Sequence, residues 1–292
     1  MTIVFIATLL VLFVSHGAPE LARWRDFAWL RQWQQTVVRQ GGDVFGLVLC
    51  MGVPVLVCAL LQVALHGRLL SAFGLAFATV VLFYCWGPRD LERDVEAIDK
   101  APDSDQRIAA AQMLRDEEQQ AGLPLDGGTL VEETFMAALR RWFGVLFWFA
   151  LLGPAGALLY RLTQLLACAP GFAEDQSAAQ RDLLHKAARV LDWLPAHLMA
   201  LSLALVSNFD AVFKSWRDYH HAGGKGYFAL DLGFLNAIAR ASVDADVAAE
   251  SVDGRPTRDP LVALDDAMVL VRRVLVTWVA IMAVIVLAGW FA

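Results

Sequence analysis

Long apolar runs without Asp, Glu, Lys or Arg alternate with charged stretches along this chain. One of these runs, Trp142 to Tyr160, is flanked by an arginine on each side. An α-helix rises about 1.5 Å per residue, so a run of this length crosses, or nearly crosses, a hydrocarbon core of about 30 Å. The pattern predicts membrane helices here and in the other charge-free runs, at residues 44–65, 69–88, 193–209 and 274–292.

A shorter apolar run covers residues 2–15. It lacks the basic start and the small-residue cleavage site of a secretory signal peptide, so we expect a retained first helix. Such a helix either crosses a locally thinned bilayer or enters it only partway. Together the runs predict an all-α fold, in which five to six spans and helical cytoplasmic loops form a single integral membrane domain over residues 1–292.

Composition supports a lipid environment. Hydrophobic residues make up 58% of the chain, charged residues make up 18%, and the mean hydropathy is +0.51. Soluble domains contain about 25% charged residues. The net charge of -6 gives no electrostatic reason to expect a nucleic-acid partner. The four cysteines lie in or beside apolar runs without ligand spacing, so we expect neither disulfides nor a metal site.

The distribution of basic residues predicts an orientation, because Lys and Arg are retained on the cytoplasmic side of a membrane. Nineteen of the 24 basic residues fall in residues 16–43, 89–141 and 210–273, which we therefore assign to the cytoplasm. The other five include four in residues 161–189, which this assignment places outside.

Polar residues close to the spans are the candidates for function, since a charge in lipid is costly unless a partner compensates it. Glu132 and Glu133 precede Arg140 and Arg141, and in a regular α-helix the two pairs lie two turns apart on one face. These four residues are candidates for ligand or partner binding. The alternative interpretation is an ordinary charged membrane boundary.

A second candidate is the stretch Leu152-Gly153-Pro154-Ala155-Gly156-Ala157-Leu158-Leu159-Tyr160-Arg161. Its structural residues are Gly153, Pro154 and Gly156, because small residues permit close helix contact and proline can kink a span. Tyr160 and Arg161 then lie at the far end of the predicted span. Either they reach the lipid headgroups, or they bind an anion or an internal carboxylate.

Two further groups flank the run at residues 193–209. Asp192 and Pro195 suit the first turn of a helix that runs to Phe209, and His197 follows as a lone histidine without metal-ligand spacing. The cytoplasmic end of this helix carries another group of polar residues, for which an exposed charged boundary is the alternative. The candidates in that group are Asn208, Asp210 and Lys214.

The motifs GPAGALLYR, at residues 153–161, and LDWLPAH, at residues 191–197, resemble the AmpE family of bacterial inner-membrane proteins. Glu132, Glu133 and the run Phe147-Trp148-Phe149 add to this resemblance, which covers nearly the whole chain. AmpE proteins look like a branch of the CobD/CbiB superfamily of cobalamin-biosynthesis membrane proteins. The resemblance implies a CobD/CbiB-like fold in the inner membrane, with several passes.

The resemblance to the CobD/CbiB enzymes is incomplete at their functional motifs. Those enzymes join an amino-alcohol phosphate to adenosylcobyric acid in an ATP-dependent amide synthesis. Their region around Glu continues to Asn and Asp-Gly, whereas this chain continues Thr134-Phe135-Met136-Ala137. Their Thr-x-Asp-Ser-Met run is replaced here by Leu162-Thr163-Gln164-Leu165-Leu166. Because magnesium-nucleotide chemistry needs carboxylates, the sequence favours a non-enzyme without cofactors, and ATP with Mg²⁺ belongs only to the alternative.

For an AmpE-like protein, the resemblance implies a signalling role that modulates β-lactamase induction in response to cell-wall status. The expected partners are the lipid bilayer and either another single-span membrane protein or a cell-wall-derived ligand. One hypothesis is that Arg161 and Asp192 shape the outer mouth of a cavity. The alternatives are a CobD/CbiB-like amide-forming enzyme and a small-solute transporter. The stretch Gly223-Gly224-Lys225-Gly226 departs from the Walker pattern and is interpreted as a flexible loop.

Overall fold

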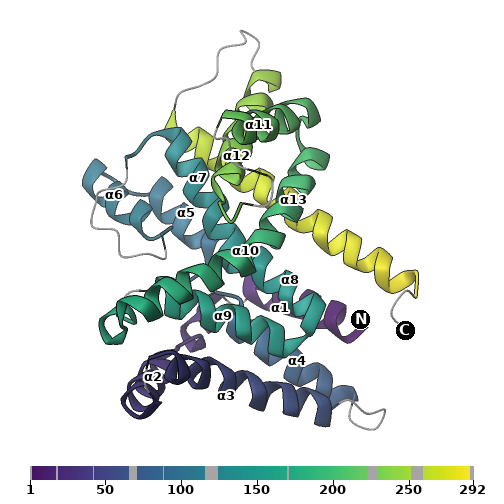
Figure 1. Cartoon of the computed structure of the whole chain (residues 1–292). Coiled ribbons are helices and arrows are strands. Elements are labelled where there is room, and N and C mark those ends of the chain that lie inside the picture. Colours follow the sequence, from purple (N-terminus) through teal and green to yellow (C-terminus); the bar gives the residue numbers. More distant parts are fainter. Residues whose placement is uncertain are drawn as a thin grey trace. The chain divides into compact units, whose positions relative to one another are not determined.

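In the computed structural model, regular structure is helical throughout the residues that are described. These are residues 2–17, 19–41, 43–65, 71–87, 89–115, 124–169, 171–222, 226, 229–250 and 259–289. They divide into two compact units, whereas the sequence predicts one membrane domain. Each unit is described by itself below, with the element labels of Figure 1.

Unit 1 contains Met1–Asp90, Gly144–Leu191 and Met282–Ala292. It is built largely from apolar helices, and its buried core includes Leu30, Leu47 and Leu162. It includes the first part of α10 (Ala178–Val206) and the end of α13 (Pro260–Leu287). Its other elements are α1 (Thr2–Gly17), η1 (Pro19–Trp24), α2 (Ala28–Gly41), α3 (Asp43–Ala64), α4 (Ser71–Cys85), α8 (Gly144–Leu152), α9 (Pro154–Cys168) and η4 (Ala173–Asp175).

Unit 2 contains Leu91–Phe143 and Asp192–Ile281. It holds the remaining parts of α10 and α13, together with helices that carry most of the charged residues discussed below. These are α5 (Leu91–Asp99), α6 (Ser104–Gln112), α7 (Gly127–Ala138), the π-helical turn η3 (Leu139–Phe143), α11 (Phe209–Ala222) and α12 (Gly233–Glu250).

The predicted fold class, an all-α membrane protein, is confirmed. Four helices in the described ranges are long and apolar enough to cross a membrane: Val44–Ala64, Gly127–Leu152, Ala178–Val206 and Pro260–Leu287. Two shorter apolar helices, Thr2–Gly17 and Ala72–Cys85, coincide with the predicted runs at 2–15 and 69–88. The apolar run predicted from residue 274 begins inside a helix that starts earlier, at Pro260, and ends at Leu287.

The run at 142–160 is not one span, and this prediction is wrong. The helix breaks at Gly153, whose φ of 70° suits glycine, and Pro154 begins α9 in its first turn. The chain then folds back, so that Tyr160 packs its ring on Gly144 and a Cβ on Gly156 would touch the Trp148 carbonyl oxygen. Helices α8 and α9 therefore form a close hairpin (Figure 1).

The hairpin turn is held by Gln62 of α3, the one amide in an otherwise apolar run. Its Nε2 donates to the Leu152 carbonyl at 3.2 Å, and its Oε1 accepts from the Ala155 N–H at 3.1 Å. A helix break leaves backbone groups without intrahelical partners, and lipid offers none. One side chain of the neighbouring helix therefore satisfies both sides of the turn.

Replacing Gln62 by leucine is expected to destabilise the protein by roughly 1–2 kcal/mol, because two hydrogen bonds to the turn are lost. Unfolding in mixed micelles titrated with a denaturing detergent measures this change. Replacing the exposed Leu60 by alanine on the same helix removes lipid-facing surface only and is the control. Equal effects of the two substitutions would contradict the assigned role of Gln62.

Helix α10 begins at Ala178, and not at Asp192 as the sequence predicts. Pro195 consequently lies inside the helix, where proline removes the hydrogen bond to the carbonyl four residues earlier. That carbonyl belongs to Leu191, and it accepts a hydrogen bond from Trp148 Nε1 at 3.0 Å. The charged residues between 178 and 192 suggested a loop, but they occupy exposed helical positions.

The same arrangement recurs in α3. Pro54 lies inside this helix and leaves the Cys50 carbonyl without its intrahelical partner. Trp33 of α2 donates its Nε1 proton to that oxygen at 3.2 Å. Both in-helix prolines therefore have their released carbonyls satisfied by a tryptophan from a neighbouring helix.

The predicted placement of residues 161–189 outside is inconsistent with unit 1. Arg31 forms an ion pair with Glu174 at 3.2 Å, and Gln34 donates to the Phe172 carbonyl at 3.2 Å. Residues 16–43 and 172–175 thus lie on the same side of any membrane that the helices cross. The charge count put these two segments on opposite sides because it assumed that the run at 142–160 crosses once.

Candidate functional site

The predicted basic residue Arg141 is buried in unit 2 and is 1% exposed. Its guanidinium pairs with Asp94 of α5 at 2.7 Å and donates to the carbonyls of Met113, at 2.7 Å, and Leu114, at 3.3 Å. Those carbonyls lie at the end of α6, where a cation is favoured and backbone acceptors need partners. Arg141 therefore fastens α5 and α6 to the π-helical turn.

The other predicted acid and base residues also have specific partners. Glu132 pairs with Arg240 of α12 at 2.6 Å, and Glu133 pairs with Arg115 at 2.7 Å. Arg140 lies 4.0 Å from the carboxylate of Asp192, which is almost completely buried. The glutamates therefore find partners in other segments. The π-helical turn at 139–143 also interrupts the α-helical register that would place all four residues on one face.

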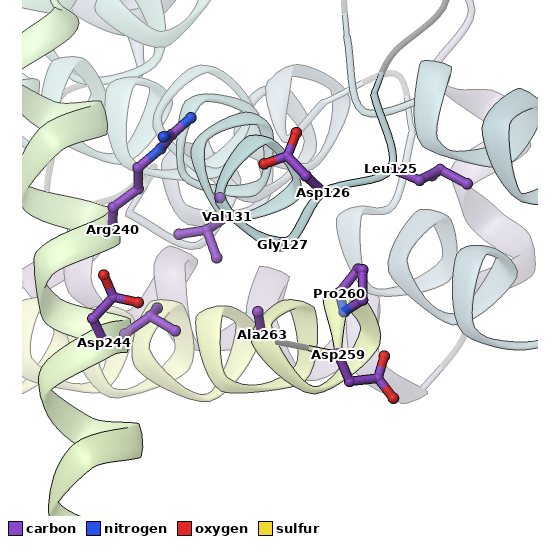
Figure 2. A pocket seen from close by; sticks show the side chains of 11 residues that line it. Leu125, Asp126, Gly127, Val131, Arg240, Asp244, Asp259, Pro260 and Ala263 are labelled. Carbon is purple, nitrogen blue, oxygen red and sulfur yellow. The ribbon is translucent and has the colours of Figure 1, made fainter. Parts of the chain in front are cut away.

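One of these pairs borders a cleft of about 560 Å³ in unit 2. The cleft lies between the first turn of α7, the middle of α12 and the first turn of α13 (Figure 2). Its size is that of a small-molecule site. The sequence interpretation missed it, because three segments far apart in the chain line it. Its lining includes Asp126, Val131, Arg240, Asp244, Asp259 and Ala263.

The cleft is more acidic than basic. Its single arginine, Arg240, forms an ion pair with Glu132, which is not among the lining residues, whereas three aspartates line the cleft. Two of them also begin helices: Asp126 accepts from the N–H of Thr129, and Asp259 accepts from the N–H of Leu261. The cleft therefore suits a cationic or hydrogen-bond-donating group better than an anion.

The hydroxyl of Thr129 donates to Asp126 and holds the pKa of that carboxyl below its usual value of 3.8, with further help from the backbone N–H and from Arg240. A lowered folded-state pKa contributes stability that is complete above the unfolded value and is lost as the pH falls through the folded value. Replacing Asp126 by asparagine, an equally good cap, is expected to leave stability at neutral pH nearly unchanged and to reduce its loss below about pH 4. Thermal unfolding from pH 3 to 7 measures this, and an unchanged acid profile would contradict the assignment.

His197 lies in an aromatic cluster in unit 2. Its ring centroid is 4.2 Å from that of Trp193 and 4.5 Å from that of Phe234, and Trp216 stacks on Phe234 at 5.7 Å. Its Nδ1 lies 2.7 Å from the Trp193 carbonyl oxygen. The LDWLPAH motif therefore joins α10 to α11 and α12 through ring packing.

Tyr160 and Arg161 are buried within unit 1. Arg161 Nε donates to the Cys85 carbonyl at 2.8 Å, so it caps the end of α4. Arg25 binds close to the same end, at the Gly87 carbonyl. Burial lowers the pKa of Arg25 to about 10, with a smaller lowering by Arg161 and an opposing effect of Asp90. Arg161 does not extend to a headgroup region as one sequence interpretation expected.

The remaining candidates do not gather into one site. Asn208 accepts from the N–H of Ala211 and begins α11, while Asp210 and Lys214 are exposed on that helix. Gly153, Pro154, Gly156 and Pro195 have the structural positions described above. The predicted flexible loop at Gly223-Gly224-Lys225 lies outside the described residues.

The model of one known family, the CobD/Cbib protein family, matches residues 18–225. The chain belongs to the CobD/CbiB family. Residues 18–225 include most of unit 1, through Leu191 of α10, and the segments of unit 2 that carry Glu132, Arg141 and His197. No curated protein and no solved structure matches the chain.

ATP with Mg²⁺ belongs to the enzyme alternative that the sequence resemblance implies, and the carboxylates of the described residues bear on that alternative. Mg²⁺ is held by carboxylate oxygens and waters beside the phosphates. Glu132, Glu133 and Asp94 each contact an arginine within hydrogen-bond distance. In the described part of the chain, no group of three or more His, Cys, Asp or Glu side chains is placed to hold a metal ion.

Proposed function

We propose that this CobD/CbiB family member is an AmpE-like regulator of the bacterial inner membrane, which modulates β-lactamase induction by binding a ligand or a membrane protein. The observation that supports this role most directly is the pairing of Glu132, Glu133 and Asp94 with arginines. Carboxylates engaged in this way fasten helices together and leave little capacity to hold a metal. The motif differences in the sequence point in the same direction.

The proposal includes an orientation. The hairpin at Gly153 returns the chain to the side on which it enters. Helix α10 is long enough to cross as a whole, but residues 193–206, which follow its charged part, rise only about 21 Å, and in this arrangement the helix enters the membrane without crossing it. Residues 161–189 then join the other basic segments on the cytoplasmic side. Of the 24 basic residues, 23 are cytoplasmic in this arrangement and only Arg68 is outside, as the positive-inside rule favours.

Single cysteines introduced into a cysteine-free variant test this orientation. A cysteine in place of the exposed Glu174 is expected to react with an impermeant thiol reagent only after the membrane is opened, because this segment faces the cytoplasm. A cysteine in place of Ala72, at the start of α4, is expected to react in intact spheroplasts. Labelling of both positions from the outside would overturn the orientation.

The regulatory role is tested by measuring β-lactamase induction in a host whose own copy of the gene is deleted. The full chain is expected to restore the response to a β-lactam. The Arg240→Ala variant, which frees Glu132 at the cleft, is expected to change that response. The Arg181→Ala variant alters an exposed residue of α10 and is the matched control.

The enzyme alternative is tested with the purified chain, Mg-ATP, an amino-alcohol phosphate and adenosylcobyric acid. We expect no amide product, with a known CobD/CbiB enzyme as the positive control. Product formation at enzyme-like rates would overturn the regulatory assignment and leave the membrane location intact.

A further inference from the structure

A groove of about 610 Å³ runs between α2 and α3 in unit 1. Its α2 wall includes Trp29, Gln32 and Trp33, and its α3 wall consists of Val53, Pro54 and Val57. The two helices lie side by side in Figure 1. None of these residues belongs to the cleft in unit 2 or to its ion pairs.

We propose that this groove binds an acyl chain of a bilayer phospholipid. The first support is that α3 faces lipid: in the apolar 18-residue stretch that defines the span Val44–Ala64, only 22% is buried within the protein. Val53 and Val57 are 37% and 52% exposed, so the α3 wall of the groove is continuous with the lipid-facing surface of the span. Hydrocarbon is therefore the medium that the groove meets.

The aromatic wall is fixed before any ligand binds. Trp29 Nε1 donates to Tyr84 Oη at 2.8 Å, and Tyr84 in turn donates to the Asp26 carbonyl. Trp33 Nε1 is held by the Cys50 carbonyl, which Pro54 releases. With both indole N–H groups engaged, the rings present their apolar faces, and their fixed positions reduce the entropy cost of binding.

The α2 side of the groove is polar at its edge. Gln32 is exposed there, and the hydroxyl of Thr36 donates to the Gln32 carbonyl at 2.9 Å. The acyl chain accordingly lies along Val53 and Val57, on the apolar side of the groove.

The size of the groove separates a lipid chain from a partner helix. A helix with its side chains is about 10–12 Å across and rises about 5.4 Å per turn, so two turns occupy about 1,000 Å³. The groove is smaller than this, and its floor has valines and a proline where close helix packing favours glycine or alanine. A single acyl chain is thin enough to enter.

Native mass spectrometry of the full chain, extracted from membranes in a mild detergent, tests the proposal. The wild-type chain is expected to retain a bound phospholipid. Val57→Trp fills the groove and is expected to weaken retention about tenfold or more, which corresponds to about 1.4 kcal/mol. Val48→Trp changes an equally exposed valine of α3 away from the groove and is expected to retain the lipid. Equal retention by both variants, or no lipid on the wild-type chain, overturns the proposal.

A photo-crosslinking residue in place of Val53 gives a second test, which does not depend on the stability of the Val57 variant. Irradiation in native membranes is expected to give an adduct with the mass of a phospholipid. An adduct with another protein, or with a second copy of this chain, overturns the proposal in favour of a helix partner.

Discussion

Replacing Arg141 by alanine is expected to lower the free energy of unfolding by about 3–5 kcal/mol, the cost of removing one partner of a buried ion pair. The substitution leaves Asp94, only 16% exposed, without its cation at 2.7 Å. It also leaves the carbonyls of Met113 and Leu114 without their donor at the end of α6. Unfolding in mixed micelles, followed by circular dichroism, measures the loss.

Two further variants sharpen this test. Arg141→Lys keeps the charge but cannot reach the carboxylate and the carbonyls with one planar group, so an intermediate loss is expected. Arg93→Ala removes an exposed arginine of α5, and its effect is expected to stay within about 0.5 kcal/mol. If Arg141→Ala were as mild as Arg93→Ala, the buried pair would not hold α5 and α6 in place.

Replacing Gly156 by alanine is expected to destabilise the protein by about 3 kcal/mol, at the upper end for overpacking. An added Cβ would collide with the Trp148 carbonyl oxygen and with the Leu152 side chain. Because a backbone atom cannot rotate away, α8 and α9 must separate. That separation also strains the contacts of Gln62 and Trp148 with neighbouring segments. Thermal unfolding in detergent measures the effect.

Gly52→Ala on α3 is the matched control. Nothing lies within 4 Å of a Cβ at Gly52, and alanine is a better helix former than glycine. This substitution is expected to be neutral or to stabilise by about 0.5–1 kcal/mol. Destabilisation of similar size at both positions would mean that the hairpin contact is not what makes Gly156 necessary.

The helical membrane class could be predicted from the sequence because lipid leaves few choices: a long charge-free run must satisfy its backbone internally. The hairpin could not be predicted in the same way. The run at 142–160 has the length of a single span, and nothing in its hydropathy marks the reversal. The local signal was Gly153-Pro154, which indicates a helix end and a helix start when the two residues are considered together.

The sequence indicated which polar residues matter, but it did not indicate the residues with which they pair. Glu132 and Arg141 were singled out because charges beside a membrane are costly, and both proved to be engaged. Arg141 pairs with Asp94, 47 residues away. Glu132 pairs with Arg240 of α12, a helix that the sequence pattern did not link to the segment around Glu132. Spacing along one helix cannot reveal such pairs. The cleft was missed for the same reason.

The two prolines inside helices affect which neighbouring helices pack together. Between helices in hydrocarbon the hydrophobic effect gives no preference for one neighbour over another. A carbonyl released by proline favours one packing arrangement, because an indole must lie at a particular height and angle to donate to it. Alanine in place of Pro54 or Pro195 would restore a backbone N–H, and the carbonyl four residues earlier would then accept an intrahelical hydrogen bond instead of the indole. A substitution that makes the individual helix more regular would then remove the hydrogen bond that specifies which neighbouring helix packs against it.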